Sequence, residues 1–306
     1  SWIGNGVVAI VLMYIDILKE LAKIILNISS ECLIVPAHIW TPWFGLFGSK
    51  SGFDSIEECF EEYSKHIYAI ETGLSSDPPM NWRLSALDNI TLISNSDAHS
   101  PKKIGREANV LELKELSYNS IIKAIKEPHS ENCKLVYTIE FFPQEGKYHF
   151  DGHRNCNVCL SPEESKKYNN ICPKCGKLLT IGVMHRVNQL ADRPTGVKPA
   201  KAIPYKSLIP LEEIIANVLG VGTGTKRVLE YYKKIIDQLG SEFEVLLRAK
   251  PEDIMAVSLP EIAEGIIRVR EGKVNLKPGY DGEFGKIRIF KDDEKKENIG
   301  GQKTLL

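Results

Sequence analysis

The chain has 306 residues, of which 43% are hydrophobic and 26% are charged, and its formal net charge is −1. This composition is ordinary for a water-soluble protein and provides no overall positive field, so any affinity for polyanions must come from local patches. The length predicts two or three domains. The apolar stretch 7–18 is interrupted by Asp16 and is too short to cross a bilayer, so we expect a buried strand or helix and no membrane partner.

The first part of the chain alternates short apolar runs with amphipathic stretches. Such alternation predicts an α/β fold, with buried strands followed by helices. The predicted strands are 32–36, 68–70 and 90–94, and the predicted helices are 14–30, 55–66 and 81–88. After Ile121 the pattern breaks up, and no regular element is predicted until the cysteine-containing segment.

Polar side chains follow each of the three predicted strands. His38 comes after the first strand, Glu71 after the second, and Asp97 and His99 after the third. Active sites of α/β proteins are built at the carboxyl ends of strands, and Asp97 and His99 are spaced to face the same side of an extended backbone. A mixed set of nitrogen and oxygen donors suits Zn²⁺, Mn²⁺ or Fe²⁺. The alternative for Asp97 and His99 alone is a capped turn with a surface histidine.

Two Cys-x-x-Cys pairs lie in the middle of the chain, and their four members are Cys156, Cys159, Cys172 and Cys175. This spacing is typical of a closed, structural zinc site, because four thiolates leave no position open for water. His153 is a further candidate ligand. A thiolate zinc site in a chain with seven cysteines predicts a reducing, cytoplasmic environment.

The segments around the cysteines have less regular patterns. His149, Asp151 and Arg154 precede the first pair, and we expect them either to contact phosphate or to brace the module. Composition predicts five regions, namely a first domain over 1–142, a zinc module over 143–190, a linker over 191–209, a helical domain over 210–290 and a disordered tail over 291–306.

A glycine-rich turn separates two helical patterns in the predicted helical domain. It contains Gly220, Gly222, Gly224, Thr225, Lys226 and Arg227. Glycines let a turn approach a backbone closely, and a helix start with adjacent cations can hold a phosphate. The turn is similar to a helix-hairpin-helix element, which grips DNA without reading its sequence, and the alternative is a plain interhelical turn.

Aromatic residues gather in the loop after the first strand end. Trp40 and Trp43 either form a hydrophobic plug or offer a platform on which an unpaired base stacks.

Three segments together resemble a known superfamily. Residues 36–44, 71–78 and 95–100 look like the later motifs of the PHP (polymerase and histidinol phosphatase) superfamily, and in particular its endonuclease Q branch. That branch has a metal-binding β/α barrel, then a four-cysteine zinc module, then a helical region, and this chain follows the same order from about residue 14 to residue 290.

The resemblance implies a metal-dependent DNA repair endonuclease. It implies cleavage on the 5′ side of deaminated bases (uracil, hypoxanthine or xanthine) or of abasic sites. His38, Asp97 and His99 would be ligands of divalent metals such as Zn²⁺, Mn²⁺ or Mg²⁺ in the barrel, and Glu71 would be a ligand or a supporting residue. The implied partner is damaged DNA, and the sequence identifies no protein partner such as a sliding clamp or another repair protein.

The chain departs from the PHP pattern at its start. PHP barrels begin with a His-x-His strand, whereas no histidine precedes His38 and residue 1 is Ser rather than Met. We therefore expect only the second half of the barrel and an incomplete copy with impaired activity, because half a ligand set cannot hold its metals in catalytic geometry. The alternatives are a non-catalytic, zinc-containing DNA-binding module and a PHP-type phosphoesterase for small molecules, which would need neither the zinc module nor the glycine-rich turn.

Overall fold

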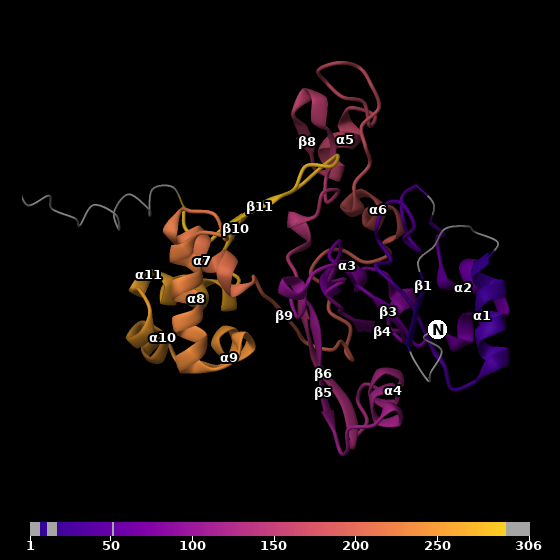
Figure 1. Cartoon of the computed structure of the whole chain (residues 1–306). Helices are drawn as coiled ribbons and strands as arrows, with labels where there is room; N and C mark the ends of the chain where they lie inside the picture. Colours follow the sequence, from indigo (N-terminus) through magenta and orange to yellow (C-terminus); the bar gives the residue numbers. More distant parts are fainter. Residues whose placement is uncertain (1–6, 11–16, 51, 292–306) are drawn as a thin grey trace, which may run out of the picture. The chain divides into compact units, whose positions relative to one another are not determined.

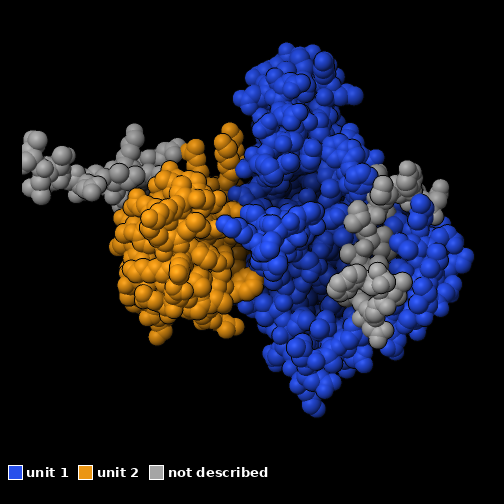
Figure 2. Space-filling model, in the orientation of Figure 1, with its two compact units in different colours: residues 1–206, 278–285 blue, residues 207–277, 286–306 orange. Residues whose placement is uncertain are grey.

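The computed structural model describes residues 7–10, 17–50 and 52–291, and it divides the chain into two compact units. Unit 1 comprises residues 1–206 and 278–285, and unit 2 comprises residues 207–277 and 286–306 (Figures 1 and 2). The segment 278–285 therefore leaves the second unit and returns to the first. Residues 14–16 of the predicted first helix and 292–306 of the predicted tail lie outside the described residues.

Unit 1 begins with two pairs of parallel strands. Strand β1 (Val7–Ile10) pairs with β2 (Leu33–Pro36). Strand β3 (Ala69–Glu71) pairs with β4 (Thr91–Ile93), with Ala69 opposite Thr91. All four residues of β2 are buried, as expected for a parallel strand covered on both faces. The strands predicted from the sequence are thus present, and the mixed α/β class is confirmed.

Helices occupy the connections between these strands. Helix α1 (Ile17–Ile28) precedes β2, and α2 (Ile56–Phe60) continues into a 3₁₀ helix (Glu61–His66) before β3. The Ser55 side chain caps the start of α2 by accepting a hydrogen bond from the N–H of Glu58 at 3.0 Å. No helix in the described part of the chain is long and apolar enough to span a membrane.

The predicted helix 81–88 is wrong in its extent. Instead, α3 (Pro78–Asn81) begins earlier, because Asp77 caps the N–H of Met80 and Pro78 occupies the first turn. A separate 3₁₀ turn follows at Ser85–Leu87. At the end of α3, the side chain of Asn81 accepts a hydrogen bond from the indole N–H of Trp40 at 2.8 Å.

A three-stranded antiparallel sheet follows where no regular structure was predicted. Strand β6 (Cys133–Glu140) lies between β5 (Ala108–Leu113) and β9 (Tyr205–Ser207), and α4 (Tyr118–Lys126) connects β5 to β6. Because β9 belongs to this sheet, the expected linker 191–209 is in large part an ordered strap of unit 1. Arg193 fastens it to Asp88 at 2.5 Å.

The cysteine-containing module is a small lobe of unit 1. It consists of the hairpin β7 (Asp151–His153) and β8 (Val158–Leu160), then α5 (Pro162–Lys167), a loop with the second cysteine pair, and α6 (Val183–Leu190). In Figure 1 it stands at the top of unit 1, and the 278–285 segment reaches it.

Unit 2 is mostly helical, as predicted. Its elements are α7 (Leu211–Leu219), α8 (Lys226–Leu239), α9 (Glu242–Leu247), α10 (Pro251–Val257) and α11 (Pro260–Arg270), with a ribbon of β10 (Asn275–Lys277) and β11 (Lys286–Arg288). Gly265 lets α11 approach α7 closely, because a Cβ there would lie 2.9 Å from a methyl group of Val218.

Candidate active site and metal-binding cluster

His38 and Glu71 meet at the carboxyl ends of β2 and β3. The backbone N–H of His38 donates to Oε2 of Glu71 at 2.7 Å, and the side-chain amide of Asn95 donates to Oε1 at 2.9 Å. Both carboxylate oxygens of Glu71 are therefore oriented by neighbours. Nδ1 of His38 is buried and has no hydrogen-bond partner, which leaves a nitrogen donor directed into the protein.

Gly73 allows this close approach. It has a φ of +61°, and a Cβ at this position would lie 2.7 Å from the Cβ of His38. Such a contact cannot be accommodated without movement of His38. The loop after β3 is thus shaped to pass directly beside the imidazole.

Asp97 and His99 form a second pair after β4. His99 Nδ1 lies 2.8 Å from the carbonyl oxygen of Asp97 and 3.9 Å from its Oδ1. A carbonyl oxygen can only accept, so Nδ1 carries the proton and the Nε2 lone pair remains available to a cation. The His99 side chain is 86% exposed.

The backbone of this region is unusual. His38 (φ 33°), Phe44 (φ 69°) and Asp97 (φ 44°) all have positive φ angles, which residues other than glycine rarely adopt. Strained backbone of this kind gathers at functional sites, where surrounding contacts hold it. For Asp97 the contacts come from the side chain of Arg106, which donates to the carbonyl oxygen of Ser96 at 2.9 Å.

The structure brings the four sequence-predicted residues together as two pairs rather than as one cluster. Asn95 adjoins the first pair, because its amide donates to Glu71, and its oxygen accepts from Asn109 at 3.1 Å. In the described part of the chain, the ligand atoms of the four do not all approach within 4.8 Å of one another. Asn95 and Asn109 were not singled out from the sequence, although Asn95 directly precedes the Ser96–His99 motif.

Two buried carboxyl groups lie behind this site. Burial raises the pKa of Glu140 to about 8, although the hydroxyls of Thr138 and Thr72 hydrogen-bond to it. Burial, followed by the charge of Glu140, raises the pKa of Glu107 well above its ordinary value. The low dielectric constant around these buried groups strengthens electrostatic interactions at the adjoining strand ends.

The cysteine module contains a cluster that could hold a metal ion. The ligand atoms of His153, Cys156, Cys172 and Cys175 all lie within 4.8 Å of one another. The cluster therefore contains three of the four cysteines predicted to bind zinc. Its fourth member is His153, which the sequence offered only as a further candidate ligand. Cys159 is outside this group, with its Sγ 3.9 Å from the carbonyl oxygen of Pro278.

Local geometry favours thiolate at Cys172. Desolvation raises the pKa of Cys172, but hydrogen bonds from the N–H groups of Lys174 and Cys175 and from the His153 and Cys175 side chains together outweigh it and lower the pKa to about 6. Gly176, with φ +74°, closes the turn by donating from its N–H to the carbonyl oxygen of Cys172 at 2.9 Å. Thiolate rather than thiol is the metal ligand, so this turn is suited to bind a cation.

Asp151 braces the module instead of facing solvent. It is fully buried, and its carboxylate bonds to His185 at 2.5 Å, to the N–H of Gly182 at 2.7 Å and to the Ser165 hydroxyl. These contacts connect β7 with α5 and α6. Of the two roles expected for this residue, the structure therefore supports bracing.

The two tryptophans of the loop after β2 have different environments. Trp40 is 1% exposed and belongs to the core, so its side chain cannot stack on a ligand in this conformation. Trp43 is 40% exposed and contacts Tyr148 edge-on, with ring centroids 5.0 Å apart. Of these two tryptophans, only Trp43 remains a candidate for contact with a base.

The glycine-rich turn of unit 2 is an interhelical connection. Gly220 ends α7 in the left-handed conformation, and Thr225 precedes α8. A Cβ at Gly222 or Gly224 would meet no heavy atom within 4 Å, so the turn is open to an approaching backbone. Lys226, Arg227 and Lys234 line a shallow surface recess with Glu230 and Tyr231.

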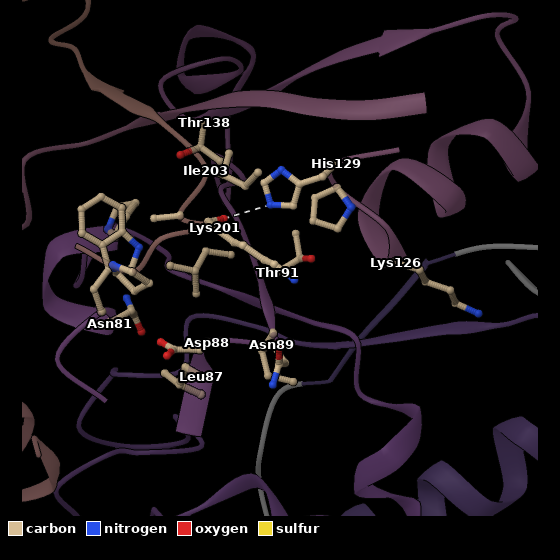
Figure 3. Close-up of a pocket in the computed structure, with 17 residues that line it drawn as sticks. Asn81, Leu87, Asp88, Asn89, Thr91, Lys126, His129, Thr138, Lys201 and Ile203 are labelled. Atoms are coloured by element: carbon tan, nitrogen blue, oxygen red, sulfur yellow. Dashed lines mark hydrogen bonds between the residues drawn. The ribbon is translucent and has the colours of Figure 1, made fainter. Parts of the chain in front are cut away.

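A separate cavity of about 250 Å³ lies in unit 1, near the amino end of β4 (Figure 3). Asn81, Asp88 and Thr91 line it together with His129, whose Nε2 donates to the carbonyl oxygen of Lys201 at 2.9 Å. The predicted ligands follow the carboxyl ends of the strands, so this cavity is not their site.

Comparison with known proteins places these features in a family. A family model described as the MJ0043 C-terminal domain matches residues 210–273. An uncharacterized protein of Methanocaldococcus jannaschii, MJ0043, is 38% identical over 82% of this chain, and the uncharacterized protein YqxK of Bacillus subtilis is 35% identical over 84%. The chain spans 31% of the first relative and 61% of the second.

Two solved structures resemble the chain over nearly its whole length. The lesion-specific endonuclease PfuEndoQ of Pyrococcus furiosus is 34% identical, with a TM-score of 0.80 over 94% of this chain and 68% of that protein. An endonuclease Q in complex with a 27-mer duplex that carries an abasic lesion at the active site is also 34% identical, with a TM-score of 0.76 over 92% and 69%. With this identity and coverage, the chain belongs to the endonuclease Q family.

Proposed function

We propose that this chain acts in a metal-dependent endonuclease that cuts damaged DNA on the 5′ side of a lesion. The observation that carries the proposal is the pairing of His38 with Glu71 and of Asp97 with His99 at the ends of neighbouring strands. The family relationship and the solved complex with an abasic duplex support DNA as the substrate. Deaminated bases (uracil, hypoxanthine and xanthine) and abasic sites are the proposed lesions.

The donor set fits divalent cations such as Zn²⁺, Mn²⁺ or Mg²⁺. His38, Asp97 and His99 would hold them, with Glu71 as a further ligand or support. Bound cations would supply Lewis acidity and an acidified water for attack on phosphorus. The protein contributes orientation: Asn95 fixes the Glu71 carboxylate, and the carbonyl oxygen of Asp97 fixes the His99 tautomer.

The cysteine module would carry a structural zinc ion. His153, Cys156, Cys172 and Cys175 provide one imidazole and three thiolate donors, a set of four that leaves no position for a reacting water. Its role is to fix the lobe through the hairpin β7–β8, and not to perform chemistry.

The glycine-rich turn would hold the DNA backbone in the manner of a helix-hairpin-helix element. Gly220, Gly222 and Gly224 leave room for a phosphate, and Thr225 precedes a helix whose N–H groups point toward it. Lys226 and Arg227 add positive charge. Contacts of this kind position DNA and are independent of sequence.

The test is a nicking assay with an end-labelled duplex that contains one abasic site, in the presence of Mn²⁺. The expected product is a single nick 5′ of the lesion. Asp97→Asn should lower the rate more than about 100-fold, because loss of a mere supporting residue costs up to that much. DNA affinity should be unchanged in this variant. A wild-type chain that leaves the duplex intact contradicts cleavage by this chain.

A second candidate is a DNA-binding module without cleavage. It is favoured by the two separate ligand pairs and by the high exposure of His99. In this case the chain binds the abasic duplex with an affinity that falls as salt rises, yet produces no nick at any Mn²⁺ concentration. Absence of binding in low salt contradicts both candidates.

A further inference from the structure

The segment 278–285 is anchored to unit 1 by backbone hydrogen bonds. Gly279, Gly282 and Gly285 each donate from the N–H, to the carbonyl oxygens of Gln144 (2.8 Å), Lys147 (3.0 Å) and Glu145 (3.0 Å) respectively. Phe150 donates back to Gly279 at 3.0 Å. These bonds give the turn a fixed backbone on the surface of unit 1.

This fixed turn projects an aromatic ring into solvent. Phe284 is 68% exposed, and the ammonium nitrogen of Lys147 lies 4.5 Å from the centre of its ring. A phenylalanine ring that is exposed on an anchored turn does not contribute the free energy that its burial would release. A ligand that covers the ring would gain this free energy. The adjacent cation makes an anionic ligand the favourable one.

Two further aromatic residues continue this surface. Tyr148 follows Lys147 in sequence and contacts Trp43 with ring centroids 5.0 Å apart. A Cβ at Gly282 would lie 3.7 Å from Oη of Tyr148 and 3.4 Å from Nη1 of Arg154, so the turn lies directly against both. We call Trp43, Tyr148 and Phe284 the aromatic wall.

The aromatic wall borders the candidate active site. Trp43 belongs to the loop that follows His38, and that loop is closed by a 2.7 Å hydrogen bond from the N–H of Phe47 to the carbonyl oxygen of Ile39. On the other side, a Cβ at Gly146 would lie 3.6 Å from the carbonyl oxygen of Leu74, in the loop after Glu71. Trp43 of the wall therefore lies in the loop that follows His38, and the segment just before Tyr148 contacts the loop after Glu71.

We propose that the aromatic wall stacks on bases of DNA that are unpaired or extruded beside a lesion, with Lys147 and Arg154 facing the adjoining phosphates. This inference rests on the proposed function and extends it to Phe284, Tyr148 and Lys147. Every base has a π-face, so stacking tolerates any sequence, and a damaged or missing base makes unstacking easier. The aromatic wall thus provides a preference for damaged DNA, whereas the glycine-rich turn of unit 2 provides affinity for DNA in general.

The test uses the full chain and two duplexes that differ only in one abasic-site analogue, each with 2-aminopurine next to that position. Binding is followed by anisotropy and base unstacking by 2-aminopurine fluorescence. Phe284→Ala should weaken binding to the lesion duplex about tenfold and suppress the fluorescence rise, while affinity for the intact duplex stays the same. Phe284→Trp should restore both signals.

The matched control is Leu116→Ala, which removes another exposed apolar side chain (89% exposed) on the connection between β5 and α4. It should behave like the wild type. Equal affinity of the wild type and Phe284→Ala for the lesion duplex overturns the stacking role, as does an equal loss on both duplexes. If the wild type binds neither duplex, both the proposed function and the stacking role are contradicted. If Phe284→Ala nicks the lesion duplex at the wild-type rate, only the stacking role is contradicted.

Discussion

Replacing Gly73 with alanine tests the close packing of the loop after β3 against His38. The new Cβ would lie 2.7 Å from the Cβ and 2.8 Å from the Cα of His38, in a backbone with φ +61°. The left-handed conformation costs about 1 kcal/mol for a residue other than glycine, and overpacking adds about 1–3 kcal/mol. We expect unit 1 to lose about 2–4 kcal/mol of its free energy of unfolding.

Gly196→Ala is the matched control, because Gly196 has φ +90° but no heavy atom within 4 Å of an added Cβ. It should cost only about 1 kcal/mol. Guanidinium unfolding followed by tryptophan fluorescence reports on unit 1 alone, since all four tryptophans of the chain lie within residues 1–206. Equal losses in the two variants would refute the claim that the loop abuts His38.

Three other predictions test the surroundings of the site. Burial lowers the pKa of His149 to about 4, so the stability that this residue contributes is present above about pH 6.5 and is lost as the pH falls toward 4. In this window, His149→Gln should reduce the slope of the unfolding free energy against pH by up to about 1.4 kcal/mol per pH unit. An unchanged slope in denaturant titrations would argue against the buried neutral form. His153→Ala should release zinc at a lower chelator concentration than Cys159→Ala, because the imidazole and not the Cys159 thiol belongs to the ligand cluster; the reverse order in a colorimetric zinc-release assay would identify Cys159 as the ligand. Asn81→Ala should destabilise unit 1 by about 1–3 kcal/mol, because the indole N–H of the buried Trp40 loses its acceptor; a loss below about 0.5 kcal/mol in the same fluorescence titration would mean that water replaces the amide.

Local pattern was sufficient for the parallel strands. The apolar runs that form β2, β3 and β4 were recognised from the sequence, and the polar residues singled out after them lie at or just beyond the strand ends. The sequence likewise indicated that unit 2 is helical, but not where its individual helices begin and end. For the candidate pairs, sequence order indicated the strand ends but not the hydrogen bond from Asn95 to Glu71, which depends on how β3 and β4 are paired.

Features fixed by distant contacts were not predictable. The strap 191–206 has the composition of a linker, yet Arg193 and β9 attach it to elements more than sixty residues earlier in the chain. In the cysteine module, the spacing favours Cys159 as a ligand, whereas the hairpin β7–β8 directs His153 toward Cys175 at 3.3 Å. Cys159 instead has its Sγ 3.9 Å from the carbonyl oxygen of Pro278, in the 278–285 segment.

The central proposal is that the residue pairs at the strand ends after β2, β3 and β4 bind divalent cations. The most direct measurement is anomalous diffraction from crystals of this chain grown with Mn²⁺. The account predicts a manganese peak within bonding distance of the Asp97 carboxylate and Nε2 of His99, on the side that faces His38. A peak confined to the cysteine module, or one at the strand ends that persists unchanged in Asp97→Ala crystals, would contradict it.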